Sequence, residues 1–235
     1  MLEASGEVRL FSAAPYEGGV ATERVVRDPT FLAPVTPSKI VCVGRNYAAH
    51  AKELGNEVPK EPLLFLKPPS ALLAPGGSIV IPADSQRVEH EGELAVVIGS
   101  RLRHASEDEA RAGIFGIAAG NDVTARDLQK KDVQFTRGKG FDTFCPAGPW
   151  IETETVDLSA ITVETRVDGV VRQHGATSAM IFPVPFLLSY ISRIMTLEPG
   201  DLVLTGTPEG VGPLAPGNVV EVEISGVGTL SNRVM

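Results

Sequence analysis

Residues 90–99 (HEGELAVVIG) place two carboxylates at the head of a continuous apolar run. In a β-strand, residues two apart point to the same face. The pattern therefore predicts that Glu91 and Glu93 project together, with Cα atoms roughly 6.5–7 Å apart. Beyond the glutamates the apolar side chains alternate to both faces, with Ala95 and Val97 on one and Leu94, Val96 and Ile98 on the other. Because neither face carries a polar stripe, we expect a strand that is buried on both sides.

Other short, β-branched runs bounded by turn residues predict further strands. They cover residues 39–44, 63–66, 78–81, 114–120, 161–167, 170–172, 201–204, 219–224 and 227–234. Asp168-Gly169 is typical of the tight turn of a hairpin. The spacing of the strands is irregular, with neither an internal repeat nor βαβ alternation, so we expect an α+β fold that is mostly β.

Helical patterns are fewer and short, at residues 47–54, 107–112, 124–131 and 185–195. Asn46 is the expected N-cap of the first helix. Ser106 and Glu109 form a capping box at the second, and Pro185 lies near the first position of the fourth. Residues 132–148 are rich in Gly, Thr and Asp and predict a long loop, which in compact domains is usually functional.

The first 35 residues differ from the rest of the chain. Two short strands, near residues 8–11 and 25–26, are separated by a turn-rich segment at 15–19, and three prolines then mark a linker: Pro29, Pro34 and Pro37. We expect a small hairpin-like N-terminal appendage over residues 1–35 and a main domain over residues 36–235.

Composition narrows the class of protein. The 235 residues carry a formal net charge of −8, which argues against a nucleic-acid-binding surface. The two cysteines form neither a disulfide framework nor a zinc-ligand spacing, and Cys42 is expected in the core. No stretch resembles a signal peptide or approaches the length of a membrane span. We therefore expect a cytoplasmic protein whose partners include neither nucleic acid nor membrane.

Two glutamates on a buried face require compensation, and a divalent cation is the simplest source. The pair Glu221 and Glu223 serves as a control, because its strand alternates cleanly and places both carboxylates on the solvated face. Asp122, at the end of a strand of small residues, is a candidate third ligand, although taken alone the residue fits better as the N-cap of a helical turn that begins at Thr124. Three carboxylates without a cysteine favour Mg²⁺, Mn²⁺ or Ca²⁺ over zinc.

Three further features could carry chemistry, and each has a plain alternative. His50 and Glu53 share a helix face and could form a base and its orienting partner, or a solvated surface pair. Lys139, between two glycines, could bind an anionic substrate or be an ordinary loop lysine. The segment Thr205-Gly206-Thr207 could bind a carboxylate through hydroxyl and backbone N–H groups, or be a simple turn.

Five motifs taken in order resemble the fumarylacetoacetate hydrolase family, from about Lys39 to the C-terminus. They are GRNYAAH at residues 44–50, EGE at 91–93, NDVTARDLQ at 121–129, KGFD at 139–142 and TGTPEGVG at 205–212. The sequences of residues 65–70 and 140–146 are most similar to those of the bacterial branch of 2-hydroxyhepta-2,4-diene-1,7-dioate isomerases. That branch includes 5-carboxymethyl-2-oxo-hex-3-ene-1,7-dioate decarboxylases, acylpyruvate hydrolases and oxaloacetate decarboxylases.

The resemblance implies a mixed β-roll or sandwich, usually a homodimer. It also implies Mg²⁺ or Mn²⁺ held by Glu91, Glu93 and Asp122, and 2-oxo acid substrates that react through an enolate. The helix that carries His50 and Glu53 would order over the bound ligand, and Lys139 would add positive charge near the enolate. Substrate-binding roles are expected for four residues in the matching motifs: Arg45, Gln129, Gly206 and Thr207.

The expected reaction depends on His50. If it holds a water molecule the outcome is C–C hydrolysis, and if it moves protons the outcome is tautomerisation or decarboxylation. The leading expectation is an isomerase or decarboxylase of 2-oxo dicarboxylates in aromatic catabolism. An acylpyruvate or fumarylpyruvate hydrolase and an oxaloacetate decarboxylase are alternatives. A further alternative is a non-catalytic homologue that binds 2-oxo acids.

Overall fold

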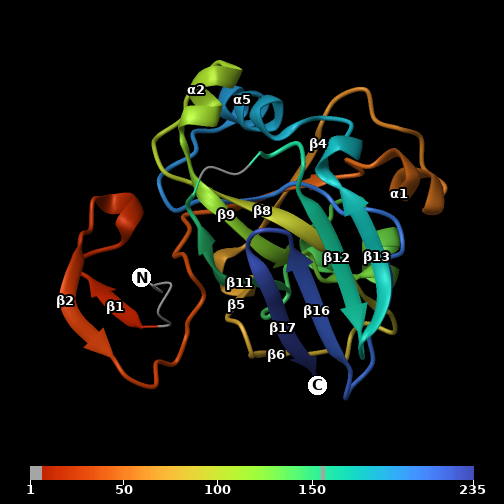
Figure 1. Ribbon diagram of the computed structural model, residues 1–235. Coiled ribbons are helices and arrows are strands. Elements are labelled where there is room, and N and C mark those ends of the chain that lie inside the picture. Colours follow the sequence, from red (N-terminus) through yellow and green to blue (C-terminus); the bar gives the residue numbers. More distant parts are fainter. Residues whose placement is uncertain (1–6, 155–156) are drawn as a thin grey trace.

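The computed structural model describes residues 7–154 and 157–235 and confirms an α+β fold dominated by strands (Figure 1). The larger sheet has seven strands in the order β4 (Leu63–Lys67), β3 (Ile40–Gly44), β14 (Leu202–Leu204), β8 (Gly92–Ile98), β9 (Ile114–Asn121), β11 (Cys145–Glu152) and β5 (Leu72–Leu73). The second sheet has five, in the order β13 (Val170–Ala176), β12 (Thr162–Val167), β16 (Val219–Ile224), β17 (Gly228–Val234) and β6 (Ser78–Ile79).

Smaller elements complete the described part of the chain. A three-stranded sheet has the order β10 (Thr124–Ala125), β7 (Val88–His90) and β15 (Gly212–Pro213). The helices are α1 (Ala48–Glu53), α2 (Glu107–Ala112), α3 (Arg126–Lys131), α4 (Thr136–Lys139) and α5 (Val184–Ile194), with 3₁₀ turns at Pro15–Glu17, Pro69–Ala71 and Thr177–Ala179. Helices α2 and α5 lie together at one end of the molecule, as Figure 1 shows.

Strand β8 is the centre of the core, and all of its residues are buried. Leu94, Val96 and Ile98 belong to one apolar cluster, which includes residues of the second sheet and of α5. Ala95 and Val97 belong to a second cluster on the opposite face of the larger sheet. The predicted burial of this strand on both faces is confirmed, with the predicted residues on each face.

The pairing of strands brings four chain segments to one end of the larger sheet. Strand β8 is antiparallel to both β9 and β14, so the start of β8 lies beside the ends of its two neighbours. Strand β3 is parallel to β14, with Ile40 opposite Leu202, and therefore ends at the same place. Residues that follow β3, β9 and β14, or that precede β8, are consequently neighbours in space.

Four details of the predicted elements were wrong. The strand expected over residues 90–99 is interrupted at Glu91, where β7 leaves one sheet and β8 enters another. Asn46 does not cap α1, because its side chain instead bonds the backbone of Phe182 and Thr205. The loop expected at 132–148 contains α4 and the start of β11, and the helical turn at 124–131 begins as the short strand β10.

Other local predictions are confirmed. Ser106 and Glu109 form the capping box of α2. Asp168-Gly169 joins β12 to β13, and a proline lies at the start of α5. Cys42 and Cys145 are both buried thiols that form no disulfide. In the part of the chain that the structure describes, no helix is long and apolar enough to cross a membrane.

The N-terminal segment forms the predicted hairpin, in which β1 (Val8–Phe11) pairs with β2 (Ala21–Val26) as a separate sheet at one side of the molecule (Figure 1). Its 3₁₀ turn is in contact with the main body, since the Tyr16 ring meets the Phe115 ring edge-on at 5.8 Å. Gly200 lies under the same ring with a φ of +84°, and a Cβ there would come within 2.6 Å of it. The division at residue 35 stays a prediction.

Candidate metal centre and active site

Glu91, Glu93 and Asp122 are buried together where the larger sheet ends. Each offers one carboxylate oxygen, and these oxygens lie within 4.8 Å of one another. Glu91 lies at the break between β7 and β8, Glu93 is the second residue of β8, and Asp122 follows β9. The two glutamates are two residues apart, and they converge at the point where the chain passes from one sheet to another.

Backbone contacts fix this convergence. The Glu91 N–H donates to Asn121 Oδ1 at 3.0 Å, and the Asp122 N–H donates to the Glu91 carbonyl oxygen at 2.8 Å. The Gly206 N–H donates to Glu93 Oε2 at 2.7 Å. The three carboxylates are therefore held by the segments that follow β9 and β14, which the sheet topology places beside the start of β8.

Three buried cations surround the carboxylates. Lys139 Nζ donates to Glu91 Oε2 at 2.8 Å and to Asp122 Oδ2 at 2.6 Å. Lys67 Nζ, at the end of β4, donates to Asp122 Oδ1 at 2.5 Å, and the Arg126 guanidinium pairs with Glu91. Among the described residues, Glu93 is paired with no cation, and its bond is to the Gly206 N–H.

The pKa values of the two glutamates shift in opposite directions. Burial would raise the pKa of Glu91, but the charges of Lys139 and Arg126 outweigh it and hold that pKa well below its usual range. For Glu93, burial and repulsion from Asp122 and Glu91 raise the pKa well above its usual range. Burial opposes the charge of Lys139, yet Asp122 and Glu91 keep its pKa raised, so the ammonium stays protonated.

This donor set fits a hard divalent cation. Three carboxylate oxygens and no thiolate are the ligands that Mg²⁺, Mn²⁺ and Ca²⁺ prefer. The ionised form of Glu93 is costly because the described residues give it no positive partner, and a metal ion would supply that charge. His90 is not among the grouped residues, since its Nδ1 bonds Gln173 instead.

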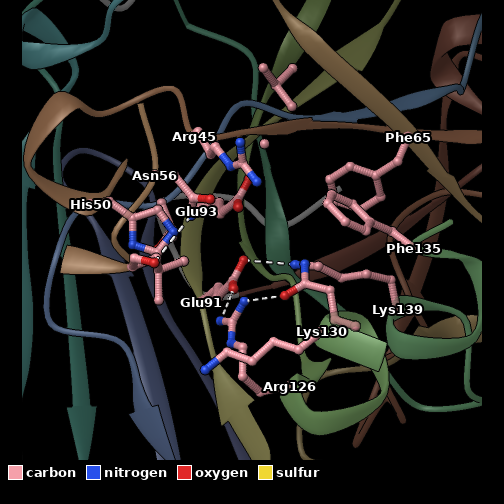
Figure 2. A pocket seen from close by; sticks show the side chains of 15 residues that line it. Arg45, His50, Asn56, Phe65, Glu91, Glu93, Arg126, Lys130, Phe135 and Lys139 are labelled. Atoms are coloured by element: carbon pink, nitrogen blue, oxygen red, sulfur yellow. Dashed lines mark hydrogen bonds and ion pairs between the residues drawn. The ribbon is translucent and has the colours of Figure 1, made fainter. Parts of the chain in front are cut away.

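Glu91 and Glu93 line a cavity of about 280 Å³, and most of the other predicted site residues line it too. Asp122, Glu53 and Gly206 are not among its lining residues. Figure 2 shows Glu91 and Glu93 between His50 on one side and Phe65 and Phe135 on the other. The lining includes Arg45, His50, Gln129, Lys130, Lys139 and Thr207. A cavity of this size with apolar walls and several charged groups suits a small polar metabolite.

His50 and Glu53 form the predicted pair on α1. His50 Nδ1 lies 3.3 Å from Glu53 Oε2, and the His50 side chain is 4% exposed. Glu53 also accepts from the Gly210 N–H at 3.0 Å, which ties α1 to the loop after β14. Gly210 has a φ of +97°, and a Cβ there would come within 2.0 Å of the Arg172 carbonyl oxygen, so a side chain would displace this contact.

Lys139 lies at the end of α4 rather than in a loop, and its flanking glycines have a packing role. A Cβ at Gly138 would come within 2.9 Å of Gln129 in α3, and one at Gly140 within 2.5 Å of the Thr136 carbonyl oxygen. These close approaches deliver the Lys139 ammonium, which lies 5.0 Å from the centre of the Phe65 ring, to the carboxylates.

The four predicted substrate-binding residues differ in what they can offer a ligand. Arg45 lines the cavity with a φ of +58°, a region that residues with a side chain rarely adopt. Gln129 Oε1 accepts from Arg126 Nη1 at 2.5 Å, so its amide hydrogens remain for a ligand. The Gly206 N–H is committed to Glu93, and the Thr207 hydroxyl donates to the Gly92 carbonyl oxygen at 2.8 Å.

Sequence reasoning gave no role to several buried polar residues of the site. Lys67 and Arg126 compensate the carboxylates, and Glu89 accepts from Arg126 Nε at 2.7 Å and so orients its guanidinium. Gln173, on β13 in the second sheet, bonds both Gly92 and Thr207. Lys67 and Arg126 lie inside segments whose sequence resembles the family. For Lys67, the available signal was a charged residue at the end of an apolar strand.

Comparison with known proteins gives the family. Residues 39–235 match the model of the fumarylacetoacetate (FAA) hydrolase C-terminal domain. The chain belongs to the fumarylacetoacetate hydrolase family. The matched region covers every residue of the site described above and begins after the N-terminal hairpin.

Relatives within this family carry names of enzymes. The chain is 51% identical over 195 residues to the oxaloacetate tautomerase FAHD1, mitochondrial, of Arabidopsis thaliana, covering 81% of this chain and 87% of that protein. It is 49% identical over 200 residues to the oxaloacetate decarboxylase, mitochondrial, of Dictyostelium discoideum, with coverage of 83% and 92%. A solved structure named 2-hydroxyhepta-2,4-diene-1,7-dioate isomerase, from Mycobacterium marinum, is 45% identical with a TM-score of 0.90, covering 97% of this chain and 87% of that one.

These findings confirm the family and the enzyme class that the resemblance implied. The fumarylacetoacetate hydrolase family holds isomerases, tautomerases and decarboxylases among the relatives of this chain. The acidic triad of this chain is suited to a divalent metal.

Proposed function

We propose that this protein is a divalent-metal-dependent enzyme that moves protons next to the 2-oxo group of small dicarboxylic acids. The observation that carries the proposal is the shared cavity, which is lined by His50, Lys139 and the two glutamates Glu91 and Glu93. Glu53 is bonded to His50, and Asp122 is bonded to Lys139 and grouped with the two glutamates. A binding protein would need the cluster and the cations, but it would not need a histidine oriented by a carboxylate.

The chain's own groups have separable roles in this proposal. His50 directs Nδ1 at Glu53, so Nε2 is the ring nitrogen that exchanges a proton with the substrate carbon. Lys139 places positive charge beside the developing enolate oxygen, in a buried site where that charge is effective. Gln129 and Arg45 present donors that fit carboxylate oxygens of the substrate.

Glu91, Glu93 and Asp122 would hold Mg²⁺ or Mn²⁺, with Ca²⁺ as a further candidate. A bound metal ion would act as a Lewis acid toward the 2-oxo acid and lower the energy of its enolate. We further propose that the protein is a homodimer, the assembly that the family resemblance implies, and that it is cytoplasmic, as we expect from a sequence without a signal-peptide pattern.

Two enzyme activities fit this chemistry best. A 2-hydroxyhepta-2,4-diene-1,7-dioate-type isomerase or related decarboxylase of aromatic catabolism is the leading candidate, supported by the likeness to the Mycobacterium marinum structure. An oxaloacetate tautomerase or decarboxylase is the second candidate, supported by relatives at 49–51% identity. An acylpyruvate or fumarylpyruvate hydrolase is the third outcome that the experiment below distinguishes.

The test offers the protein a panel of substrates and monitors the turnover of each by its change in absorbance. Oxaloacetate, an acylpyruvate and a 2-hydroxydienoate dicarboxylate are each offered with Mg²⁺, with Mn²⁺ and with a chelator. We expect metal-dependent turnover of at least one. Turnover that survives the chelator would refute the metal requirement, and binding without turnover of any would favour a 2-oxo-acid-binding protein.

His50→Ala separates binding from chemistry. Because general acid–base catalysis contributes roughly 10²–10⁴ in rate, we expect kcat to fall by that factor while Mn²⁺ affinity stays unchanged. A kcat equal to that of the wild type would remove His50 from the mechanism.

A further inference from the structure

Gln173 is a buried side chain that contacts two parts of the metal centre from outside it. It lies on β13 in the second sheet and is 1% exposed. Its Oε1 accepts from the Gly92 N–H at 3.0 Å and from His90 Nδ1 at 3.0 Å. Its Nε2 donates to Thr207 Oγ1 at 2.7 Å and to the Pro208 carbonyl oxygen at 2.8 Å.

The orientation of this amide is fixed by backbone groups. The Gly92 N–H can only donate, so the atom that faces it must be the amide oxygen. The Pro208 carbonyl can only accept, so the atom that faces it must be the amide nitrogen. Both assignments agree, and a flipped amide would break both bonds at once.

This orientation determines the direction of the Thr207 hydroxyl proton. Because Gln173 donates to Thr207 Oγ1, the hydroxyl proton must point elsewhere, and it is donated to the Gly92 carbonyl oxygen. The Thr207 hydroxyl then has no proton left for a substrate carboxylate. In the described structure its hydroxyl holds Gly92, and the substrate-binding role that the sequence predicts for Thr207 stays a prediction.

Gly92 is the residue between the ligands Glu91 and Glu93, and both of its backbone polar groups are held by this network. Its N–H bonds Gln173 directly, and its carbonyl oxygen bonds Thr207, which Gln173 orients. A Cβ at position 92 would come within 2.0 Å of Thr165 Oγ1, so glycine is needed for the second sheet to approach this closely. The peptide planes on either side of Gly92 set the directions of the two glutamates.

We propose that Gln173 is a positioning residue of the metal centre: through Gly92 and Thr207 it sets the relative orientation of the Glu91 and Glu93 carboxylates. This inference rests on the metal chemistry proposed above. Residues that support metal ligands in this way typically contribute 10–100-fold to metal affinity. A residue with a merely structural role would affect the stability of the protein and leave the affinity for metal unchanged.

Asn232 offers a matched control for a structural role. It is a buried amide of the second sheet, and its Nδ2 donates to two backbone carbonyl oxygens, those of Ala74 and Gly77. It does not line the cavity that holds the carboxylates. Asn232→Leu therefore removes a comparable set of buried bonds at a different place.

The experiment measures the Mn²⁺ dissociation constant of the full chain by calorimetry, without substrate, beside the melting temperature of the metal-free protein. We expect Gln173→Met to weaken Mn²⁺ binding at least tenfold, and Asn232→Leu to lower the melting temperature with the wild-type dissociation constant. Thr207→Val, which removes one hydroxyl and keeps the volume, carries the test if Gln173→Met fails to fold, and it should also weaken Mn²⁺ binding.

In the double variant Gln173→Met/Thr207→Val, the two losses of Mn²⁺ affinity should not add, because both residues act on the backbone of Gly92. Wild-type dissociation constants for Gln173→Met and Thr207→Val would overturn the inference. Absence of Mn²⁺ binding in the wild-type protein is a different result, and it would refute the proposed metal centre itself.

Discussion

The chain contains two Glu-x-Glu segments with opposite surroundings. Glu91 and Glu93 are buried at the end of the larger sheet, whereas Glu221 and Glu223 lie on the partly exposed face of β16 in the second sheet. On β16, residues 220, 222 and 224 point into the core, so the glutamates take the solvated positions, as the alternation predicts. The same three-residue pattern is therefore part of a candidate metal centre in one place and a surface feature in the other.

The electrostatic partners of the two segments differ as much as their burial. Glu223 pairs with Arg166 at 2.7 Å, with its side chain 43% exposed, and solvent screens such a pair. Glu91 pairs with the buried cations Arg126 and Lys139, where few solvent molecules compete. Because Glu91 and Glu93 are buried, a change of charge at either residue should affect both the stability of the protein and its binding of ligands.

The largest expected effect follows from Glu91→Gln. It removes the proposed metal ligand and the common partner of Arg126 and Lys139. Arg126 keeps Glu89 and Lys139 keeps Asp122, so the loss of stability should stay below the roughly 3–5 kcal/mol of a buried charge left without a partner. Loss of the metal's contribution of several kcal/mol should lower kcat/KM by roughly 10²-fold or more. Steady-state kinetics measures the fall in kcat/KM, and thermal unfolding measures the loss of stability. Glu221→Gln is the control and should change neither kcat/KM nor the melting temperature.

Metal affinity should depend strongly on pH through Glu93. Its pKa in the folded protein is raised, so the carboxyl binds a proton where an ordinary glutamate is ionised, and a metal ion must displace that proton. Mn²⁺ affinity should therefore rise with pH, by up to about tenfold per unit while Glu93 is protonated. Calorimetry in buffers of different ionisation enthalpy checks the proton release, and a pH-independent affinity would contradict the assignment.

Glu93→Gln should separate stability from binding. In the metal-free protein, ionised Glu93 destabilises the fold as pH rises past its ordinary pKa, whereas Glu91, with its lowered pKa, contributes stability that is lost only as pH falls. The neutral amide keeps an acceptor for the Gly206 N–H. We expect a melting temperature a few degrees higher at pH 8 together with loss of Mn²⁺ binding. A lower melting temperature would show that the charge of Glu93 is compensated.

The smallest effect is expected at the surface segment. Glu223→Gln breaks an exposed ion pair with Arg166, and such pairs contribute little. Melting temperature, Mn²⁺ affinity and kcat should all match the wild type. A change in Mn²⁺ affinity would mean that the two segments are coupled through the second sheet.

The contrast also shows how far the sequence could lead. Alternation around Leu94, Val96 and Ile98 predicted a strand buried on both faces, and alternation around Glu221 predicted a solvated pair. Both depend on local periodicity, which the sequence contains. The break at Glu91 could not be predicted in this way, because β7 and β8 join different sheets there, and that pairing depends on strands far along the chain.

The side chains that support the carboxylates also depend on pairing between distant strands. Lys67 and Arg126 reach the carboxylates, and Gln173 reaches Gly92 between them, only because tertiary pairing brings β4, the segment after β10, and β13 to this place. Asn46 shows the opposite failure: a good N-cap residue is used instead to bond the backbone of Phe182 and Thr205. At Asn46 the local capping propensity is overridden because buried backbone groups of Phe182 and Thr205 need a partner.

The parallel pairing of β3 with β14, which sets Ile40 beside Leu202, has a consequence for folding kinetics. The cavity exists only after segments separated by most of the chain have paired, and such distant contacts form slowly because loop closure costs entropy. A metal ion that binds the finished site and not the unfolded chain therefore adds stability by mass action. Binding of the proposed metal ion would then also show that the β3–β14 pairing is complete.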